Sequence, residues 1–316
     1  MKLPELRIGD YMPKFPIIQG GMAVRVSTSS LAGAVAAAGG IGVIAATGMA
    51  LDELKAEIRQ ARKLANGGVL GVNIMYAAKE FADLVSTAID EGIDIIFTGA
   101  GFSRDIYRWA KGSDTAIVPI VSSAKAARIA VKYGAAAVVA EGTEAGGHLG
   151  TDRPTREVLS EIVQAVDVPV VAAGGIVNGQ DIADMVKLGA SGVQMATRFV
   201  LSEECTVADE FKQLYLDAKE EDVVLINSPV GLPGRAINNK LAQQMDQGEY
   251  PRIKECGRCL KDCSKAYCIM KALTNARDGN VDEGVVFSGQ YVYKIKEILP
   301  VKVIFERLLQ EYEMVK

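Results

Sequence analysis

The sequence is short of positive charge. Its 35 lysine and arginine residues are outnumbered by 39 aspartate and glutamate residues, so the formal net charge is -4. A broad basic surface is needed to bind a phosphate backbone or an anionic membrane, and we therefore expect neither nucleic acid nor a membrane as a partner. Low-complexity segments are also lacking. Apolar residues at 49% and charged residues at 23% indicate an ordinary globular protein.

Long apolar runs are scarce as well. The uncharged run 31–51 is long enough to cross a bilayer, but it is rich in glycine. Gly39 and its neighbour divide it into an alanine-rich helix and a short strand at 41–46, which predicts a buried helix-turn-strand unit. At the N-terminus, Lys2 and Arg7 come before any apolar stretch, which argues against a secretory signal. We expect a cytoplasmic protein.

Cysteine is sparse and unevenly placed. Four of the five cysteines lie between residues 256 and 268, a distribution unlike a disulfide framework. Cys256, Cys259, Cys263 and Cys268 have the spacing C-x2-C-x3-C-x4-C, which predicts thiolate ligation of zinc or of an iron-sulfur cluster. The alternative is four reduced, unligated thiols in a helical segment. Cys205 stands apart, and we expect it to be a partly buried thiol.

What the sequence does contain is a regular alternation of two kinds of segment. Short runs of apolar, often β-branched residues recur without polar alternation, which indicates strands buried on both faces. The eight runs are residues 16–19, 41–46, 70–75, 93–98, 116–121, 136–140, 168–173 and 192–196.

Segments of helix-forming composition separate these runs, and several end at a glycine suited to a helix C-terminus. They are residues 29–38, 51–65, 78–91, 103–111, 124–133, 155–165 and 180–188. The alternation predicts an α/β fold, a (β/α)8 TIM barrel over residues 1–200. A doubly wound open sheet would show the same alternation, but eight consecutive units with one phosphate-type glycine turn near the end favour closure.

The alternation of strand-like and helix-like segments ends after Phe199. Residues 203–221 are acidic and helical in composition, residues 227–235 form a loop rich in proline and glycine, and residues 301–313 form an amphipathic helix. We therefore predict a second unit, residues 201–316. It would be a mainly helical C-terminal appendage with the cysteine cluster and the closing helix.

Small and polar residues follow the predicted strands. Catalytic groups of a barrel enzyme come from the carboxyl ends of its strands and the loops behind them. Glycine lets a planar ligand approach the backbone, and amide side chains such as Asn73 and Gln194 can hydrogen-bond an amide-rich ring such as a flavin. A tight turn explains any single glycine of this set. Their joint placement predicts a ligand site.

A glycine turn after the seventh strand predicts a phosphate site. Residues 172–179, which include Ala173, Gly174 and Gly175, stand directly before a predicted helix, where backbone amides face an anion. Ala196 and Thr197 follow the eighth strand, and loops after strands seven and eight form the phosphate site of many barrels. FMN, with one terminal phosphate, fits such a site. The glycine run 38–42 precedes a strand and lacks the context of a dinucleotide-binding fingerprint.

Five ordered motifs carry a resemblance to a known family. They are residues 17–22 (IIQGGM), 71–75 (GVNIM), 141–148 (EGTEAGGH), 171–176 (VAAGGI) and 194–199 (QMATRF), with a weaker one at 228–235 (SPVGLPGR). In these motifs the chain resembles the nitronate monooxygenase family, formerly called 2-nitropropane dioxygenases. That family shares its fold and motifs with FMN-dependent enoyl-ACP reductases.

The resemblance implies an FMN site and assigns residues to it. Those expected around FMN are Gly21, Met22, Asn73, Glu141, Gly174, Gly175, Gln194, Met195 and Thr197. Gly146, Gly147 and His148 would form the loop over the isoalloxazine ring. Ser122 and Lys125 follow the fifth strand and are weaker candidates for the flavin edge.

His148 is the single histidine of the chain. A lone histidine is often structural, but this one follows two glycines in a loop after the sixth strand, on the catalytic face of the barrel. Its side chain has an ordinary pKa near neutrality and suits acid-base chemistry. We therefore predict that His148 is catalytic.

Three functions compete at this stage. The first is oxidation of an alkyl nitronate by oxygen through reduced FMN, and the second is reduction of an enoyl thioester or quinone by NAD(P)H through FMN. The third is a non-redox isomerase or synthase that acts on a phosphorylated metabolite. It explains the phosphate site but not the ordered motifs. The substrate is a small molecule in each case. Oligomeric state stays open, with a homodimer as one alternative.

Overall fold

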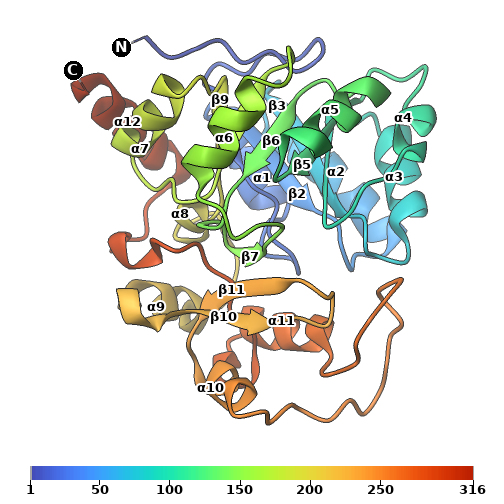
Figure 1. Ribbon diagram of the computed structural model, residues 1–316, viewed down its shortest axis with the longest axis vertical. Coiled ribbons are helices and arrows are strands. Elements are labelled where there is room, and N and C mark those ends of the chain that lie inside the picture. The colour runs from blue at the N-terminus through green and yellow to red at the C-terminus, as the bar shows by residue number, and fades with distance from the viewer. Residues whose placement is uncertain (1, 316) are drawn as a thin grey trace.

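The computed structural model describes residues 2–315, and eight parallel strands close into a barrel within it (Figure 1). Hydrogen-bonded neighbours follow the order β1-β2-β3-β4-β5-β6-β8-β9, and β9 pairs with β1 to close the ring. The strands are β1 (Ile17–Gln19), β2 (Ile41–Ala45), β3 (Val69–Met75), β4 (Ile95–Gly99), β5 (Ala116–Val121), β6 (Val138–Glu141), β8 (Val170–Ala173) and β9 (Gly192–Met195). The predicted TIM barrel is confirmed.

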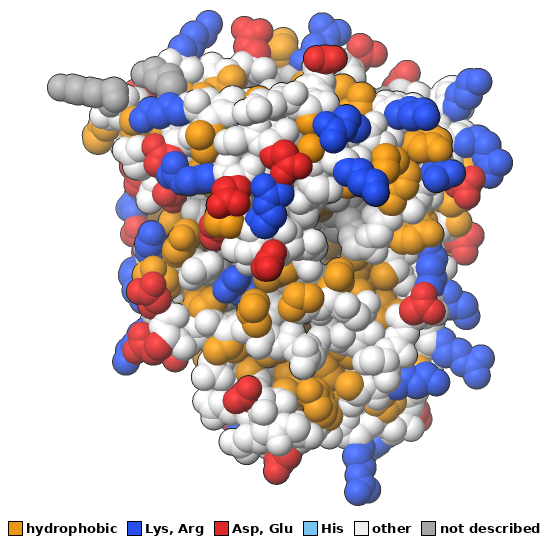
Figure 2. Space-filling model, in the orientation of Figure 1, with side chains coloured by type: hydrophobic (Ala, Val, Ile, Leu, Met, Phe, Trp, Pro, Cys, Tyr) orange, Lys and Arg blue, Asp and Glu red, His pale blue; other side chains and the backbone are white. Residues whose placement is uncertain are grey.

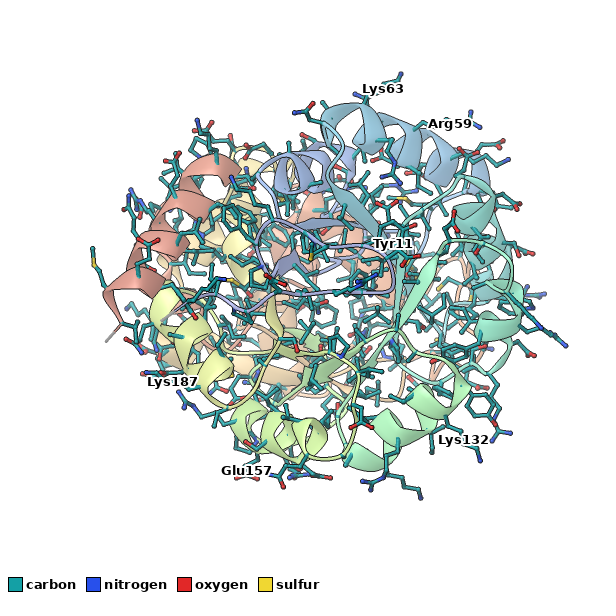
Figure 3. All side chains as sticks on the ribbon, turned by 90° about the horizontal axis from the view of Figure 1, so that it is seen from above. Tyr11, Arg59, Lys63, Lys132, Glu157 and Lys187 are labelled. Atoms are coloured by element: carbon teal, nitrogen blue, oxygen red, sulfur yellow. The ribbon has the colours of Figure 1, made fainter. Side chains whose placement is uncertain are left out.

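A helix follows most strands and packs on the outside of the barrel. These helices are α1 (Ser29–Ala37), α2 (Leu51–Leu64), α3 (Phe81–Asp90), α4 (Asp105–Trp109), α5 (Ala124–Tyr133), α6 (Thr155–Val163), α7 (Gly179–Lys187) and the short α8 (Thr197–Val200). Seen from above they surround the strands, and their charged side chains, such as Arg59, Lys132 and Glu157, point outward (Figure 3). Burial of the strands between helices explains their unbroken apolar sequences.

The glycine-rich run 31–51 forms the predicted helix-turn-strand. The alanine-rich face of α1 lies directly on β2, where a Cβ at Gly42 would come within 1.8 Å of the Ala32 carbonyl oxygen. The same helix approaches the chain before β3, since a Cβ at Gly68 would lie 2.2 Å from the Ala36 carbonyl oxygen. Small residues on both sides therefore set the distance between helix and strands. No helix among the described residues is long and apolar enough to cross a membrane.

The N-terminal segment covers one end of the barrel. Leu6 and Ile8 of this segment are fully buried, and the hydroxyl of Tyr11 donates a hydrogen bond to the carbonyl of Asp114. Tyr11 lies near the centre of the ring of helices in the view from above (Figure 3). The end where the strands begin is therefore closed, and a ligand can approach only where they finish.

A second layer covers the opposite end of the barrel (Figure 1). It holds α9 (Asp209–Asp217), η1 (Glu220–Asp222), β10 (Val223–Asn227), β11 (Pro233–Ile237), α10 (Lys240–Asp246), α11 (Ile269–Arg277) and η2 (Val281–Glu283). The two strands form an antiparallel hairpin, and β11 also pairs with β7 (Gly147–His148), which belongs to a barrel loop. The expected long loop 227–235 is thus a turn and part of a strand. Its proline and glycine residues reverse the chain between two strands.

The chain ends on the barrel. After η3 (Val292–Lys294), helix α12 (Val301–Met314) packs against α7 and α1, and Phe305 contacts Phe199 with a ring-centroid distance of 5.9 Å. The sequence-based division at residue 200 grouped this helix with the appendage. Its apolar face, which includes Ile304, Phe305 and Leu308, is instead buried in the same core cluster as α7.

The contact between α1 and β2 gives a test of this packing. We expect Gly42→Ala to lower the free energy of unfolding by about 3 kcal/mol or more, because the new methyl group would overlap the backbone of Ala32. Gly99→Ala is the matched control, since a Cβ on this strand glycine would meet only Ile120, at 3.5 Å. Urea-induced unfolding of both variants measures the difference, and an equal loss of stability in the two would contradict this account.

Candidate active site

A pocket lies at the carboxyl ends of the strands, between the barrel and the second layer. On the face shown in Figure 2 the surface is hollowed at the seam between the two parts, and apolar side chains gather below it. The pocket is lined by most of the residues predicted from the sequence, namely Gly21, Met22, Asn73, Glu141, Gly146, Gly147, His148, Ala173, Gly174, Gly175, Gln194, Met195, Ala196 and Thr197.

Ser122 and Lys125, the weaker candidates for the flavin edge, do not line this pocket. Strand β5 ends at Val121, and Ile120 is its residue in the pocket. The hydroxyl of Ser122 faces Gly150, where a Cβ would lie 2.8 Å from it. Lys125 is exposed on the first turn of α5. The chain has already turned outward into the helix at these positions.

The glycine turn after β8 forms one end of the pocket. Gly174 and Gly175 have φ values of +108° and +72°, which suit glycine and few other residues. A Cβ at Gly174 would lie 2.7 Å from the Thr155 hydroxyl and 2.9 Å from the Ala145 amide. Within residues 2–315 the amides of Gly175 and Ile176 donate to no protein acceptor. These free donors at a glycine turn fit a phosphate group.

The floor of the pocket also requires glycine. A Cβ at Gly21 would come within 2.3 Å of the Asn73 Cβ, so the loop after β1 lies directly on β3. The hydroxyl oxygen of Ser288 is buried on the pocket wall and has no hydrogen-bond partner among the described residues. An unsatisfied buried hydroxyl and close backbone approach both fit a planar ligand rich in hydrogen-bonding groups.

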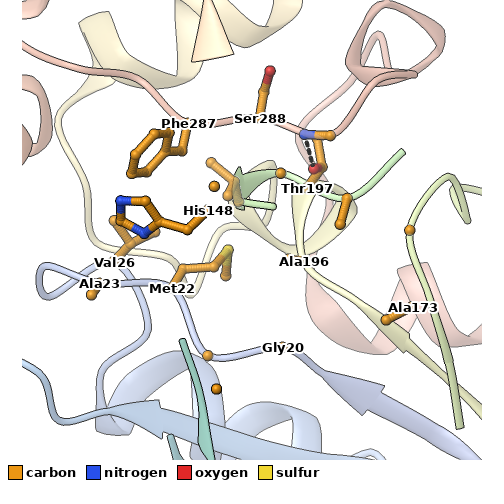
Figure 4. A pocket seen from close by; sticks show the side chains of 18 of the residues that line it. Gly20, Met22, Ala23, Val26, His148, Ala173, Ala196, Thr197, Phe287 and Ser288 are labelled. Atoms are coloured by element: carbon orange, nitrogen blue, oxygen red, sulfur yellow. Dashed lines mark hydrogen bonds between the residues drawn. The ribbon is translucent and has the colours of Figure 1, made fainter. Parts of the chain in front are cut away.

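His148 projects into the pocket from β7. Gly234 on β11 is its pairing partner, so a backbone ladder and not a free loop holds the histidine. Phe287 packs edge-on against the imidazole with a ring-centroid distance of 5.1 Å, and Met22 lies on its other side (Figure 4). Burial lowers the pKa of His148 to about 4. The imidazole is therefore neutral near pH 7.

Ser228 fixes the orientation of this imidazole. Its hydroxyl oxygen lies 2.7 Å from His148 Nε2 and also accepts a hydrogen bond from the Val230 amide. The serine hydroxyl can accept from Nε2–H or donate to Nε2, and it donates when the ring proton is on Nδ1. A neutral imidazole held in this way can donate Nδ1–H to a carbonyl oxygen.

Glu141 is another titratable group of the pocket whose pKa is shifted. It ends β6 and faces the pocket, and its carboxyl makes no hydrogen bond with the described residues. Burial raises its pKa from 4.5 to about 7. A carboxyl of this kind is partly protonated at neutral pH and can donate to a ligand acceptor.

The second layer supplies residues that sequence reasoning missed. Phe287, Ser288 and Tyr291 line one side of the pocket, and the Gly289 amide donates a 2.9 Å hydrogen bond to the Thr197 hydroxyl (Figure 4). An apolar wall completes the site, formed by Val230, Leu260, Ile269, Met270, Leu273 and Val285. Gly279, Gly284 and Gly289 indicate turns in this part of the sequence, but they do not reveal where the segment folds.

The four clustered cysteines do not line this pocket. Cys256 is exposed, while Cys259, Cys263 and Cys268 are half-buried. Across residues 2–315 no group of three or more histidine, cysteine, aspartate or glutamate side chains is arranged to hold a metal ion. Metal ligation by these cysteines stays a prediction. Cys205 is fully buried.

The raised pKa of Glu141 predicts a pH-dependent stability. A folded-state pKa above the unfolded value favours the protonated carboxyl, so its contribution is fully present below pH 4.5 and lost as the pH rises through about 7. For ligand-free protein, we expect Glu141→Gln to gain about 3 kcal/mol over the parent between these limits. Urea unfolding from pH 4 to 8 measures this gain. Glu221→Gln, at an exposed position, is the control, and a constant difference between Glu141→Gln and the parent would contradict the assignment.

Comparison with known proteins places this site in a family. The model of the nitronate monooxygenase family matches residues 7–311. The "(3aS,4S,5R,7aS)-5-hydroxy-7a-methyl-1-oxo-octahydro-1H-indene-4-carboxyl-CoA dehydrogenase" of Mycobacterium tuberculosis is 29% identical over 93% of this chain and 92% of its own length.

Two solved structures share the whole architecture. FabK from Thermotoga maritima superposes with a TM-score of 0.87 at 34% identity, over 95% of this chain and 93% of that one. A nitroalkane oxidase from Streptomyces ansochromogenes superposes with a TM-score of 0.82 at 25% identity, over 95% and 96% of the two chains. With its barrel, glycine turn and strand-held histidine, the chain is an oxidoreductase and belongs to the nitronate monooxygenase family.

Proposed function

We propose that the chain is an FMN-dependent reductase of α,β-unsaturated acyl thioesters that uses NAD(P)H as electron donor. The observation that carries this proposal is the charge of the pocket. Within residues 2–315 no lysine or arginine lines it, and burial lowers the pKa of His148 to about 4, so the imidazole is neutral. A largely apolar site lined by Glu141 and Glu144 but by no cation suits an enoyl thioester better than a nitronate anion, whose burial without a partner is costly.

Two arginines that stand next to site residues in the chain make contacts elsewhere. Arg235 lies on β11 opposite Gly147, and its guanidinium donates to the carbonyl oxygen of Thr143 at 2.8 and 3.1 Å. Arg198 follows Thr197 and donates to the carbonyl oxygens of Leu201 and Glu297. Both guanidinium groups serve to join segments of the fold, which leaves the pocket without positive charge.

The relatives support the same substrate class. FabK, an enoyl-ACP reductase, is 34% identical over nearly the whole chain. The M. tuberculosis relative is named as a dehydrogenase of a carboxyl-CoA ester, which is also a thioester. In both cases the acyl group is carried by a larger thiol, and an open seam between barrel and second layer can admit such a carrier.

The residues of the pocket fit FMN. The free amides of Gly175 and Ile176, with Thr197 beside them, would hold the phosphate, and Asn73, Gln194 and the loop at Gly21 would hold the ring. FMN, when bound, would supply a carrier that takes a hydride from NAD(P)H and passes it to the β-carbon of the substrate, while the α-carbon would take a proton from solvent.

His148 and its partners orient the substrate in this proposal. Nδ1–H would donate to the thioester carbonyl oxygen, where negative charge develops as the β-carbon is reduced. A hydrogen bond donated by Ser228 to Nε2 would hold the ring in the required tautomer, and Phe287 packs against the ring edge-on. The apolar wall from Leu260 to Val285 would exclude water and pack against the acyl chain.

Oxidation of an alkyl nitronate by oxygen is the second candidate. The family model and the S. ansochromogenes nitroalkane oxidase favour it. It requires the pocket to hold an anion, and protonation of His148 is the available source of positive charge. Nitronate turnover would then rise as the pH falls toward the pKa of His148, whereas thioester reduction would not depend on that charge.

Anaerobic half-reactions distinguish the two functions. The purified protein, reconstituted with FMN, is mixed with NADH, NADPH or an alkyl nitronate, and the bleaching of the flavin is followed. The reduced protein is then mixed with oxygen or an enoyl thioester. The proposal predicts fast reduction by a nicotinamide and fast reoxidation by the thioester. Reduction by the nitronate alone would overturn it in favour of monooxygenation, and failure to take up FMN would remove both.

The role of His148 gives a specific prediction. We expect His148→Ala to retain FMN while kcat for the thioester falls roughly 100-fold to 10,000-fold, because the carbonyl oxygen loses its donor. Flavin absorbance measures retention, and steady-state kinetics measure kcat. Ser228→Ala, which leaves the imidazole in place without its partner, should lose less activity. Undiminished turnover in His148→Ala would exclude the histidine from the mechanism.

A further inference from the structure

The segment 286–288 extends the sheet that carries the imidazole. Strand β10 occupies one edge of β11, and β7 occupies part of the other. Further along that second edge, the Ile237 amide donates to the Val286 carbonyl at 2.9 Å, and the Ser288 amide donates to the Arg235 carbonyl at 3.2 Å. The segment therefore continues the ladder on which the imidazole stands.

The ring of Phe287 lies over Gly234, the residue that pairs with His148. A Cβ at Gly234 would come within 2.7 Å of Phe287 Cε1, so only glycine leaves room for this ring. The phenyl ring and the imidazole meet edge-on, with 5.1 Å between their centroids and 68° between their planes (Figure 4). Both rings depend on one short stretch of ladder, and a shift of Phe287 would change the surroundings of His148.

The carbonyl oxygen of Phe287 has its hydrogen-bond donor outside this sheet. The bonds made by Val286 and Ser288 flank Phe287, so its own carbonyl points away from β11. Within residues 2–315 the hydroxyl of Tyr215, on α9, donates to this oxygen and no other group does. Because a buried carbonyl that loses its donor is costly, this bond holds the backbone of Phe287 in place.

Tyr215 is a fixed donor. Its side chain is 2% exposed, and its ring stacks on Phe211 with 5.3 Å between the ring centroids. Burial raises the pKa of Tyr215, so the hydroxyl keeps its proton at neutral pH. Helix α9 thus places one polar group, in an otherwise apolar contact, behind the wall of the pocket.

Ser228 and Phe287 hold different parts of the imidazole. The Ser228 hydroxyl lies 2.7 Å from Nε2 of His148, and a single hydrogen bond leaves the ring free to tilt about that atom. Phe287 on one side and Met22 on the other limit this tilt (Figure 4). The contact with Phe287 therefore sets the angle of the ring and covers one of its edges.

Charged side chains do not account for the neutral state of the imidazole. Arg235 on β11 donates to the Thr143 carbonyl, and Glu141 and Glu144 line the pocket. None of them contributes to the shifted pKa of His148, which burial alone lowers. The groups that keep water from the ring therefore also keep it neutral.

We propose that Tyr215 is a positioning residue that fixes the imidazole of His148 by way of Phe287. The Tyr215 hydroxyl holds the Phe287 backbone, the phenyl ring covers one edge of the imidazole, and the imidazole stays directed into the pocket. Donation from this imidazole to a thioester carbonyl rests on the proposed function. The position of the ring does not, because it follows from contacts within the protein.

Nuclear magnetic resonance of the single histidine tests the proposal. The protein is reconstituted with FMN and labelled at histidine with nitrogen-15, and the ring signals are followed from about pH 8 to about pH 5 without substrate. The parent imidazole should stay neutral over this range, since its pKa is about 4. In Tyr215→Phe water should reach the ring beside the freed Phe287 carbonyl, and the pKa of His148 should rise toward 6.5. An unchanged titration would overturn the proposal.

Tyr312→Phe is the matched control. Tyr312 is 1% exposed, its hydroxyl donates to the Lys2 carbonyl at 3.1 Å, and it does not line the pocket. Both variants remove a hydrogen bond from a buried tyrosine hydroxyl to a backbone carbonyl. We expect His148 to titrate in Tyr312→Phe as it does in the parent. An equal rise of its pKa in both variants would refute the proposal, since a general loosening of the fold would explain it.

A double variant tests the path through Phe287. Phe287→Leu should raise the pKa of His148 on its own, and adding Tyr215→Phe should change it little further, because the ring that transmits the effect is gone. Fully additive rises would contradict this path.

Kinetics give a second measure of the same role. For thioester reduction, kcat in Tyr215→Phe should fall roughly 10-fold to 100-fold with little change in KM, since the carbonyl donor is misplaced. An unchanged kcat together with an unchanged titration would exclude Tyr215 from positioning His148. Because the imidazole is observed without substrate, its titration decides the role of Tyr215 even if a thioester is not the substrate.

Discussion

The pairing of β7 with β11 is the contact on which the site depends. It joins a barrel loop to the second layer through the register Gly234 to His148 and Arg235 to Gly147, and the Arg235 guanidinium reinforces it at the Thr143 carbonyl. Without this ladder His148 would stand on an open loop in water. With it, the imidazole is enclosed by Phe287 and Ser228, and that enclosure lowers its pKa to about 4. The fold thereby determines the charge state of the reactive group.

The barrel forms a rigid floor for the pocket, and the second layer encloses the pocket from the other side. Close contacts leave no room for a methyl group at Gly42, where β2 packs on α1, or at Gly21, where the loop after β1 lies on the Asn73 side chain. The opposite end is sealed by Leu6 and Ile8. A ligand is therefore confined to the pocket at the open end of the barrel, between the floor formed by the strand ends and the cover formed by residues 203–292.

The sequence predicted the barrel well because its strands are buried on both faces and read as unbroken apolar runs, as at 116–121, where prediction and structure coincide. Pocket residues at strand ends followed from the same regularity. Strand β7 could not be predicted, because two residues are too few to show any periodicity. The packing of α12 on α7 could not be predicted either, because it depends on contacts between segments far apart in the chain. Ser122 and Lys125 lie outside the pocket because only two residues separate the end of β5 at Val121 from the start of α5 at Ala124.

Within residues 2–315 no lysine or arginine lines the pocket, whereas the neighbouring segment 249–268 is rich in both. In the proposed reaction negative charge develops on a carbonyl oxygen, and a neutral hydrogen-bond donor in a site without water stabilises that transition state. A permanent cation would instead bind anions already in the ground state, which does not accelerate the reaction. Residues 249–268, which contribute Leu260 to the apolar wall, have the opposite composition, with five lysine and arginine residues against three acidic ones. Charge is therefore kept beside the apolar wall and not within it.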